Sequence, residues 1–257
     1  MLQDIFNLFV RVFNIGFIVV YYVTILLLLG TAICWHSRDR WRRAAVAGGL
    51  AFAAKIICWP LVVWLAATRR TAAAVGVAVV AGGVTFVLWG TLGFSGLVDY
   101  PSSLGTLNRA VSSESYTVKV MLLDLGAEVG LARLGGILAA LGVVAGTIVL
   151  GRRGDDRRSF ALAVTAMIVA SPIVWLHSFA LLLAPVAVMR PRLSVAWLLP
   201  VLLVIGTGTG NGTPWQTAGV LGLAALTLGV ALAPSGSQPV EASSSSVPLV
   251  STIPASE

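Results

Sequence analysis

Apolar stretches fill most of this chain, and short clusters of arginine separate them. The longest stretch runs from Ser159 to Arg190, SFALAVTAMIVASPIVWLHSFALLLAPVAVMR. About twenty residues suffice to span a bilayer, so this stretch has length to spare for a single crossing. Arginines stand before it and at its exit, and clustered arginines are typical of the cytoplasmic side of a span. We therefore expect both of its ends in the cytoplasm.

The middle of this stretch holds a helix breaker and several polar groups. Pro172 cannot donate a helical backbone hydrogen bond, and Ser171 and Trp175 carry polar groups that need partners. His177 adds a ring that titrates near neutral pH. The pattern predicts a helical hairpin that enters from the cytoplasm, breaks at SPIVWLH and returns, with its polar tip near the outer face.

A second stretch, Ala44 to Thr68, repeats this arrangement. Arginines flank it, and Lys55 and Pro60 interrupt its centre. An ammonium within a span costs a few kcal/mol unless it meets water, a carboxylate or an anionic ligand. We predict a second hairpin, also tipped toward the outer face. The alternative is one tilted helix with Pro60 as a kink and Lys55 snorkelling to the interface.

The other segments complete a membrane topology. The predicted order is a short lead at 1–14, a first span at about 15–35, an outward span at 71–93, an outer loop at about 94–119, an interfacial segment at 120–133, an inward span at 134–150, an outward span at 193–209, an inward span at 217–233, and a disordered Ser/Pro-rich cytoplasmic tail at 234–257. The transmembrane helical domain thus covers 15–233.

The basic residues support this topology, because most of the 17 fall on the assigned inner side. Four lie outside and Lys55 lies within a hairpin. The twelve inner residues are Arg38, Arg40, Arg42, Arg43, Arg69, Arg70, Arg152, Arg153, Arg157, Arg158, Arg190 and Arg192.

Composition fixes the class as an all-α, polytopic membrane helical bundle with two broken helical hairpins. Hydrophobic residues make up 58% of the chain, charged residues only 11%, and the mean hydropathy is +0.94. The net charge of +7 follows from the arginine clusters, so we expect no nucleic-acid partner. Cys34 and Cys58 lie in or beside apolar stretches and are expected to be small buried hydrophobes. We expect a multi-pass protein of the plasma membrane.

The chain carries no recognisable soluble-enzyme motif and no metal-ligand spacing, so neither a metal nor a cofactor is expected. The polar residues gathered by the predicted hairpin tips and the outer loop are instead the candidate site. The candidate substrate-binding residues are Lys55, Pro60, Ser171, Trp175, His177 and Tyr116, and the candidate catalytic residues are His177, Asp99 and Glu114.

These residue types suit an anionic, lipid-linked ligand. Lys55 can meet a phosphate as a point charge, and the Trp175 indole can pack on a sugar or an isoprenoid chain. His177 can hydrogen-bond a hydroxyl or assist a proton transfer. A satisfied core histidine and solvated loop acids are the structural alternatives.

Three patches resemble glycosyltransferase family 87. The run SRDRWRRAAVAGGLAFAAKIICWPLVVWLAATRR is similar to the family's basic turn and following small-residue helix, which ends in Lys and Pro. GFSGLVDYPSSL with the neighbouring Ser115 and Tyr116, and SPIVWLHSFALLLAP, resemble its later outer loop and its Ser-Pro and Trp-x-His signature. The resemblance extends over about 14–233.

The resemblance implies a GT-C fold and transfer of a hexose, mannose in the nearest cases, from a polyprenyl-phosphate donor to a lipid or glycan acceptor outside the cytoplasm. Enzymes that build actinobacterial phosphatidylinositol mannosides and lipomannan are of this kind. The family's proposed base is an aspartate in the first outer loop, a region not matched here. A truncated gene product, a split enzyme completed by a second chain and an inactive remnant are the competing explanations, and Asp99 or Glu114 could substitute as base.

A transporter or lipid flippase fragment is the alternative function, because broken helices with polar tips also build substrate sites in carriers. The similarity of the two hairpins to each other keeps this alternative open. A structural helical subunit without a ligand is a third possibility, but it leaves Lys55 and His177 unexplained. The sugar, the acceptor and the linkage are not encoded in any recognisable motif.

Overall fold

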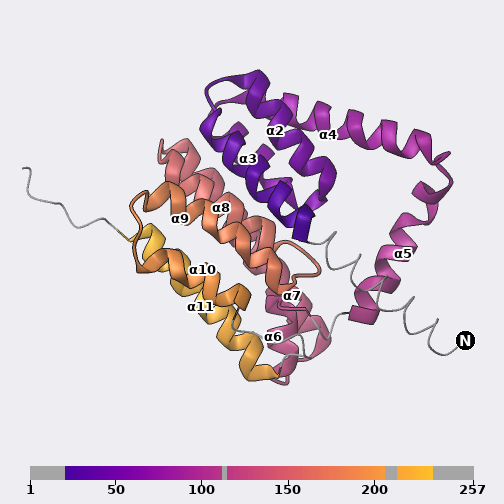
Figure 1. Cartoon of the computed structure of the whole chain (residues 1–257). Helices are drawn as coiled ribbons and strands as arrows, with labels where there is room; N and C mark the ends of the chain where they lie inside the picture. Colours follow the sequence, from indigo (N-terminus) through magenta and orange to yellow (C-terminus); the bar gives the residue numbers. More distant parts are fainter. Residues whose placement is uncertain (1–20, 112–114, 206–212, 234–257) are drawn as a thin grey trace, which may run out of the picture.

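A computed structural model describes residues 21–111, 115–205 and 213–233, and every regular element in these ranges is helical (Figure 1). The all-α prediction is confirmed. The elements are a first helix Tyr21–His36, α2 Trp41–Ala54, η1 Ile56–Cys58, α3 Pro60–Ala67, α4 Thr71–Thr91, α5 Ser95–Val111, α6 Val118–Asp124, α7 Val129–Arg152, α8 Asp156–Val169, η3 Leu176–Leu182, α9 Leu183–Met189, α10 Val195–Ile205 and α11 Pro214–Leu232. The predicted lead, the predicted tail and Glu114 lie outside the described residues.

The first predicted hairpin is present. α2 ends where Lys55 adopts an extended conformation, with φ −154° and ψ 121°. α3 then begins at Pro60, whose missing N–H costs nothing at a first helical position. A straight helix over 41–67 would separate its ends by about 40 Å. The Arg70 guanidinium instead lies 3.0 Å from the Asp39 carboxylate, so the chain folds back on itself.

The first helix packs against both arms of this hairpin. A Cβ placed on Gly30 would lie 2.8 Å from the Ala51 Cβ, so the first helix and α2 approach closely. Trp35 of the first helix stacks on Trp64 of α3, with ring centroids 5.6 Å apart. The hairpin arms are therefore braced by a third helix.

The second predicted hairpin is also present. α8 ends at Val169, a non-helical stretch follows, and η3 with α9 returns along α8. Both open ends of this second hairpin, at Arg158 and at Arg190, contact the end of α11. Arg158 donates to the Leu232 carbonyl at 3.4 Å, and Arg190 donates to the carbonyls of Val230 and Ala233, each at 3.0 Å. Like the first hairpin, the second consists of a helix, a break and a helical arm that returns along the first.

Three helices, α4, α7 and α11, are long and apolar enough to cross a membrane by length and composition. On α7, apolar side chains face outward: Leu134, Leu138 and Leu141 are each more than half exposed. Apolar surface of this extent suits lipid contact. The chain is a membrane protein, and α4 and α7 correspond to the predicted crossings at 71–93 and 134–150.

The segment expected as an outer loop differs from the prediction, because it contains α5 and the start of α6. Gly93 and Phe94, both with positive φ, form the turn between α4 and α5. The polar sequence of this segment indicated exposure to water, which an exposed helix satisfies as well as a loop does. Beyond α6, the turn at Gly126 leads into α7, which begins at Val129 and so starts before the predicted boundary.

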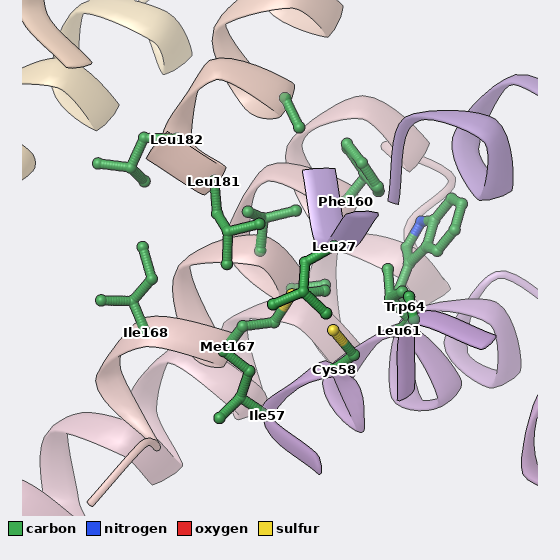
Figure 2. Packing of buried hydrophobic residues seen from close by; sticks show 14 of the residues in the cluster. Leu27, Ile57, Cys58, Leu61, Trp64, Phe160, Met167, Ile168, Leu181 and Leu182 are labelled. Carbon is green, nitrogen blue, oxygen red and sulfur yellow. The ribbon is translucent and has the colours of Figure 1, made fainter. Parts of the chain in front are cut away.

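The two hairpins pack on each other through a shared apolar core (Figure 2). Cys58, Leu61 and Trp64 of the first hairpin meet Phe160 and Met167 of the second, and all five side chains are fully buried. Cys34 and Cys58 are free and buried, as predicted. The core fixes the two breaks in the chain relative to each other.

Gly49 marks the closest packing of α2 on α4. A Cβ at this position would lie 2.5 Å from the Val80 Cβ and 3.1 Å from the Val77 carbonyl oxygen. We expect Gly49→Ala to lower the free energy of unfolding by about 1–3 kcal/mol, because α4 must move. Thermal unfolding in detergent measures this change. Gly82→Ala is the matched control: its Cβ would meet no atom within 4 Å, so any loss there equal to that of Gly49→Ala would contradict the prediction.

Candidate functional site

The breaks of the two hairpins lie close together. Lys55 precedes η1, and His177 lies in the first turn of η3. α8 contacts both η1 and η3, so the two breaks lie against the same helix. The Trp175 and His177 rings are 6.0 Å apart and tilted by 51°. The fold therefore brings together a cation, an imidazole and an indole from segments about 120 residues apart in sequence.

A short segment between α5 and α6 closes one side of this cluster, which we call the tip cluster (Lys55, Tyr116, Trp175 and His177). The Tyr116 amide donates to the Val174 carbonyl at 2.9 Å, and the Val174 amide donates to the Ser115 hydroxyl at 2.9 Å. Tyr116 is 6% exposed and belongs to the apolar core. The sequence-based choice of Tyr116 thus places it beside the second hairpin's break.

Two further predicted site residues have structural explanations. The Ser171 hydroxyl donates to the Ile173 carbonyl at 2.6 Å and so stabilises the turn itself. Pro60 is buried at the start of α3. By contrast, Trp175 is 44% exposed, and Lys55 and His177 are only partly buried. The side chains open to a ligand are therefore Lys55, Trp175 and His177.

Lys55 has no counter-charge within the part of the chain that the structure describes: no carboxylate there lies within 4.0 Å of its ammonium. Across the same residues, no group of three or more His, Cys, Asp or Glu side chains could hold a metal ion. An ammonium in such surroundings needs an anion or water. The tip cluster suits binding of an anionic ligand.

Of the three candidate catalytic residues, His177 is the one that belongs to the tip cluster. Asp99 is exposed on α5, and no described hydrogen bond or ion pair joins its carboxylate to the tip cluster. Glu114 is not among the described residues. The described residues therefore offer an imidazole, but no carboxylate base, at this site.

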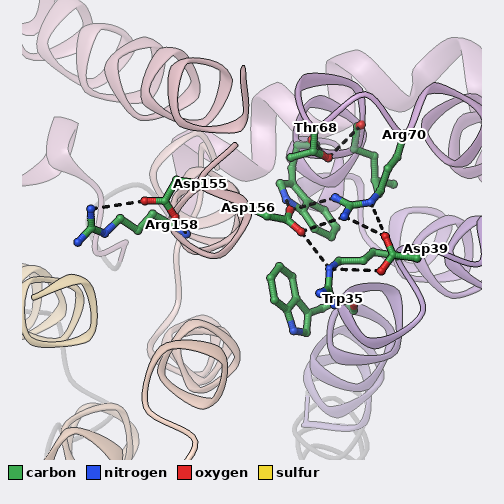
Figure 3. A network of polar contacts seen from close by, with 10 residues as sticks. Trp35, Asp39, Thr68, Arg70, Asp155, Asp156 and Arg158 are labelled. Carbon is green, nitrogen blue, oxygen red and sulfur yellow. Dashed lines mark hydrogen bonds and ion pairs between the residues drawn. The ribbon is translucent and has the colours of Figure 1, made fainter. Parts of the chain in front are cut away.

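A second polar cluster lies at the opposite, open ends of the hairpins and centres on Asp156 (Figure 3). Its carboxylate accepts from Arg38 Nε at 2.9 Å, from Trp64 Nε1 at 2.9 Å and from Arg70 Nη1 at 3.1 Å. Arg70 also pairs with Asp39 at 3.0 Å. We call these five residues the Asp156 cluster; it joins the start of α8 to both ends of the first hairpin.

Aromatic rings and charge reinforce this cluster. The Arg38 guanidinium lies 4.2 Å from the centre of the Trp35 ring. The centroids of the Trp35 and Phe160 rings are in turn 4.6 Å apart. Burial opposes the charge of Arg70, but the hydrogen bonds and charges of Asp156 and Asp39 outweigh it, so the pKa of Arg70 is raised. Arg70 therefore keeps its positive charge, and the cluster acts as a clamp between the two hairpins.

The sequence-based reasoning missed the Asp156 cluster. It treated the arginines of these turns as topology signals and did not single out the acids among them. Asp39, Asp155 and Asp156 each stand within an otherwise basic turn. Acids in such positions are a usable signal, because they can pair with the arginines of a neighbouring turn.

Comparison with known proteins supplies the family. The chain matches glycosyltransferase family 87 over residues 9–172, which is more than half of its length. No curated protein and no solved structure matches it. The matched range contains Lys55, Tyr116 and Asp156 and ends just before Trp175 and His177. Together with the apolar helices, the match identifies a membrane protein of the glycosyltransferase class, and the chain belongs to glycosyltransferase family 87.

Proposed function

We propose that the chain acts in transfer of a hexose, with mannose as the first candidate, from a polyprenyl-phosphate donor to a lipid or glycan acceptor. In this proposal the reaction takes place on the extracytoplasmic side of the plasma membrane, where the arginine pattern of the sequence predicts the tip cluster. Family membership supports glycosyl transfer, and the resemblance noted in the sequence supports this donor class.

The observation that carries the proposal is the partly buried Lys55 ammonium at the break of the first hairpin, which has no carboxylate within 4.0 Å among the described residues. A phosphate monoester or diester on a lipid supplies the missing negative charge, and charge-assisted contacts of this kind are among the strongest hydrogen bonds in proteins. A neutral soluble sugar would leave the ammonium uncompensated.

Trp175 and His177 of the tip cluster provide contacts for the sugar. The exposed Trp175 ring offers an apolar face for a pyranose or an isoprenoid unit, and its neighbour His177 offers a hydrogen bond to a hydroxyl. Because the described acids do not join this cluster, we propose that the base that activates the acceptor comes from residues outside the described ranges or from a second chain.

Transfer is tested directly with membranes from cells that express the full chain, supplied with polyprenyl-phosphate mannose labelled in the sugar. We expect label in a lipid or glycan product, above that of membranes lacking the chain. A nucleotide sugar should not replace the lipid-linked donor when synthesis of that donor is blocked. Label accumulating as free sugar inside sealed vesicles, without donor and without product, would instead favour the transporter alternative.

A further inference from the structure

A cavity with four arginines opens at the end of the bundle opposite the tip cluster. Its volume is about 390 Å³, within the range typical of ligand pockets. The turn between α3 and α4 forms one wall and the turn between α7 and α8 forms the other. The lining residues are Thr68, Arg69, Arg70, Gly151, Arg152, Arg153, Gly154 and Asp156.

The single acid in this lining does not neutralise the cavity. Both oxygens of Asp156 already accept from Arg38, Arg70 and Trp64. In the described part of the chain, Arg69, Arg152 and Arg153 form no ion pair, and their side chains are exposed. Three guanidinium groups are therefore free to bind an anion, and guanidinium suits a phosphate with its planar set of donors.

The walls of the cavity are held in place by close packing. A Cβ on Gly151 would lie 2.9 Å from both the Ala67 Cβ and the Ser159 hydroxyl oxygen, so α7 presses on the end of α3 and the start of α8. The Ser159 hydroxyl is buried and donates to the Thr147 carbonyl at 2.7 Å. Arg69 has a positive φ of 64°, a conformation uncommon outside glycine. This packing fixes the backbone positions from which the arginine side chains extend.

The position of the cavity indicates the source of the anion. α4 begins at Thr71 and α7 ends at Arg152, and both are candidate membrane spans, so the cavity lies at the level where two spans leave the hydrocarbon. Phospholipid headgroups occupy this level, and basic pockets between membrane helices bind anionic headgroups. The arginine pattern assigns this end to the cytoplasmic side.

We propose that this cavity binds the phosphodiester headgroup of an anionic phospholipid of the inner leaflet. Arg69, Arg152 and Arg153 contact the phosphate, while Arg70 is held by Asp156 and Asp39 and forms the inner wall. The ligand joins the α3–α4 turn to the α7–α8 turn and so stabilises the packing of the two hairpins. This inference does not depend on the transfer reaction at the tip cluster.

Native mass spectrometry of the detergent-solubilised full chain, titrated with phosphatidylglycerol or with phosphatidylcholine of the same acyl chains, tests the proposal. We expect clear preference for phosphatidylglycerol. The double variant Arg152→Gln/Arg153→Gln should weaken its binding about 25-fold, at about fivefold for each arginine. The control Arg43→Gln/Arg157→Gln removes two exposed arginines from outside the cavity lining and should retain nearly full affinity.

Wild-type protein alone gives an independent test. Phosphatidylglycerol should raise its midpoint of thermal unfolding above the value in phosphatidylcholine, because a ligand that binds the folded state stabilises it. Equal binding of both lipids, or equal losses in the two double variants, would overturn the proposal in favour of diffuse surface charge. Displacement of the lipid by inorganic phosphate at equal concentration would overturn it in favour of a soluble phosphate ligand.

Discussion

Lys55→Met is expected to lower the rate of sugar transfer by about 10- to 100-fold. Methionine keeps the apolar stem of the side chain but removes the ammonium, so the donor phosphate loses a charge-assisted contact that contributes about 1.5–3 kcal/mol. Lys55→Arg keeps the positive charge and should restore part of the activity, since arginine also binds phosphate although with a different shape. Initial rates with labelled polyprenyl-phosphate mannose measure the effect.

The chain provides a matched control for this substitution. Lys119 of α6 is the only other lysine in the sequence, and it lies outside the tip cluster. Lys119→Met should leave transfer nearly unchanged. If both methionine variants lost the same activity, or if Lys55→Met turned over at the wild-type rate, Lys55 would have no role in donor binding. Equal midpoints of thermal unfolding for the two variants exclude misfolding as the cause of a loss.

Asp156→Asn is expected to lower the free energy of unfolding by about 2–3 kcal/mol. The amide leaves Arg38 and Arg70 facing each other without the carboxylate between them, and breaking a buried ion pair by removing one partner costs more than the pair contributes. The side chain of Asp156 is 23% exposed, so water recovers part of the loss and the estimate lies below that for a fully buried pair. Equilibrium or thermal unfolding in detergent gives the value.

The neighbouring acid, Asp155, provides a control that distinguishes the contribution of the Asp156 cluster from a general effect of charge. Asp155 caps α8 by accepting from the Arg158 amide at 3.1 Å and pairs with the Arg158 side chain at 3.4 Å. Asp155→Asn removes the same charge one residue earlier but keeps an acceptor for the cap, so we expect a loss of only about 0.5–1 kcal/mol. Equal losses at the two positions would show that the Asp156 cluster does not join the hairpins.

Both breaks in the hairpins could be predicted from local sequence. Pro60 and Pro172 lack the N–H that a continuing helix needs, and arginines at both ends of each stretch placed those ends on one side. For the first hairpin the alternative of one tilted helix was open, because local sequence does not show how far apart the two ends lie. The 3.0 Å contact between Arg70 and Asp39 decides for the hairpin.

The structure of the segment at about 94–119, by contrast, was not predicted from local sequence. Polar residues between 94 and 119 predicted exposure, and Asp99 is indeed exposed, but the segment is largely helical. Polarity reports on contact with water, whereas helix formation depends on backbone hydrogen bonds that an exposed segment can also make. For the same reason the sequence could not tell that the Asp99 carboxylate would make no described hydrogen bond or ion pair with the tip cluster.

The sequence by itself determined the helical membrane class and the presence of an interruption in each of the two long apolar stretches, because hydrophobic length and proline both act within a short window. Only the tertiary structure decided that the first stretch folds back as a hairpin, that Ser115 binds the second break, and that Asp156 joins the hairpins. The contacts of Ser115 and Asp156 connect residues 59 to 118 positions apart. Such pairings depend on how the hairpins pack on their shared core, which no local pattern specifies.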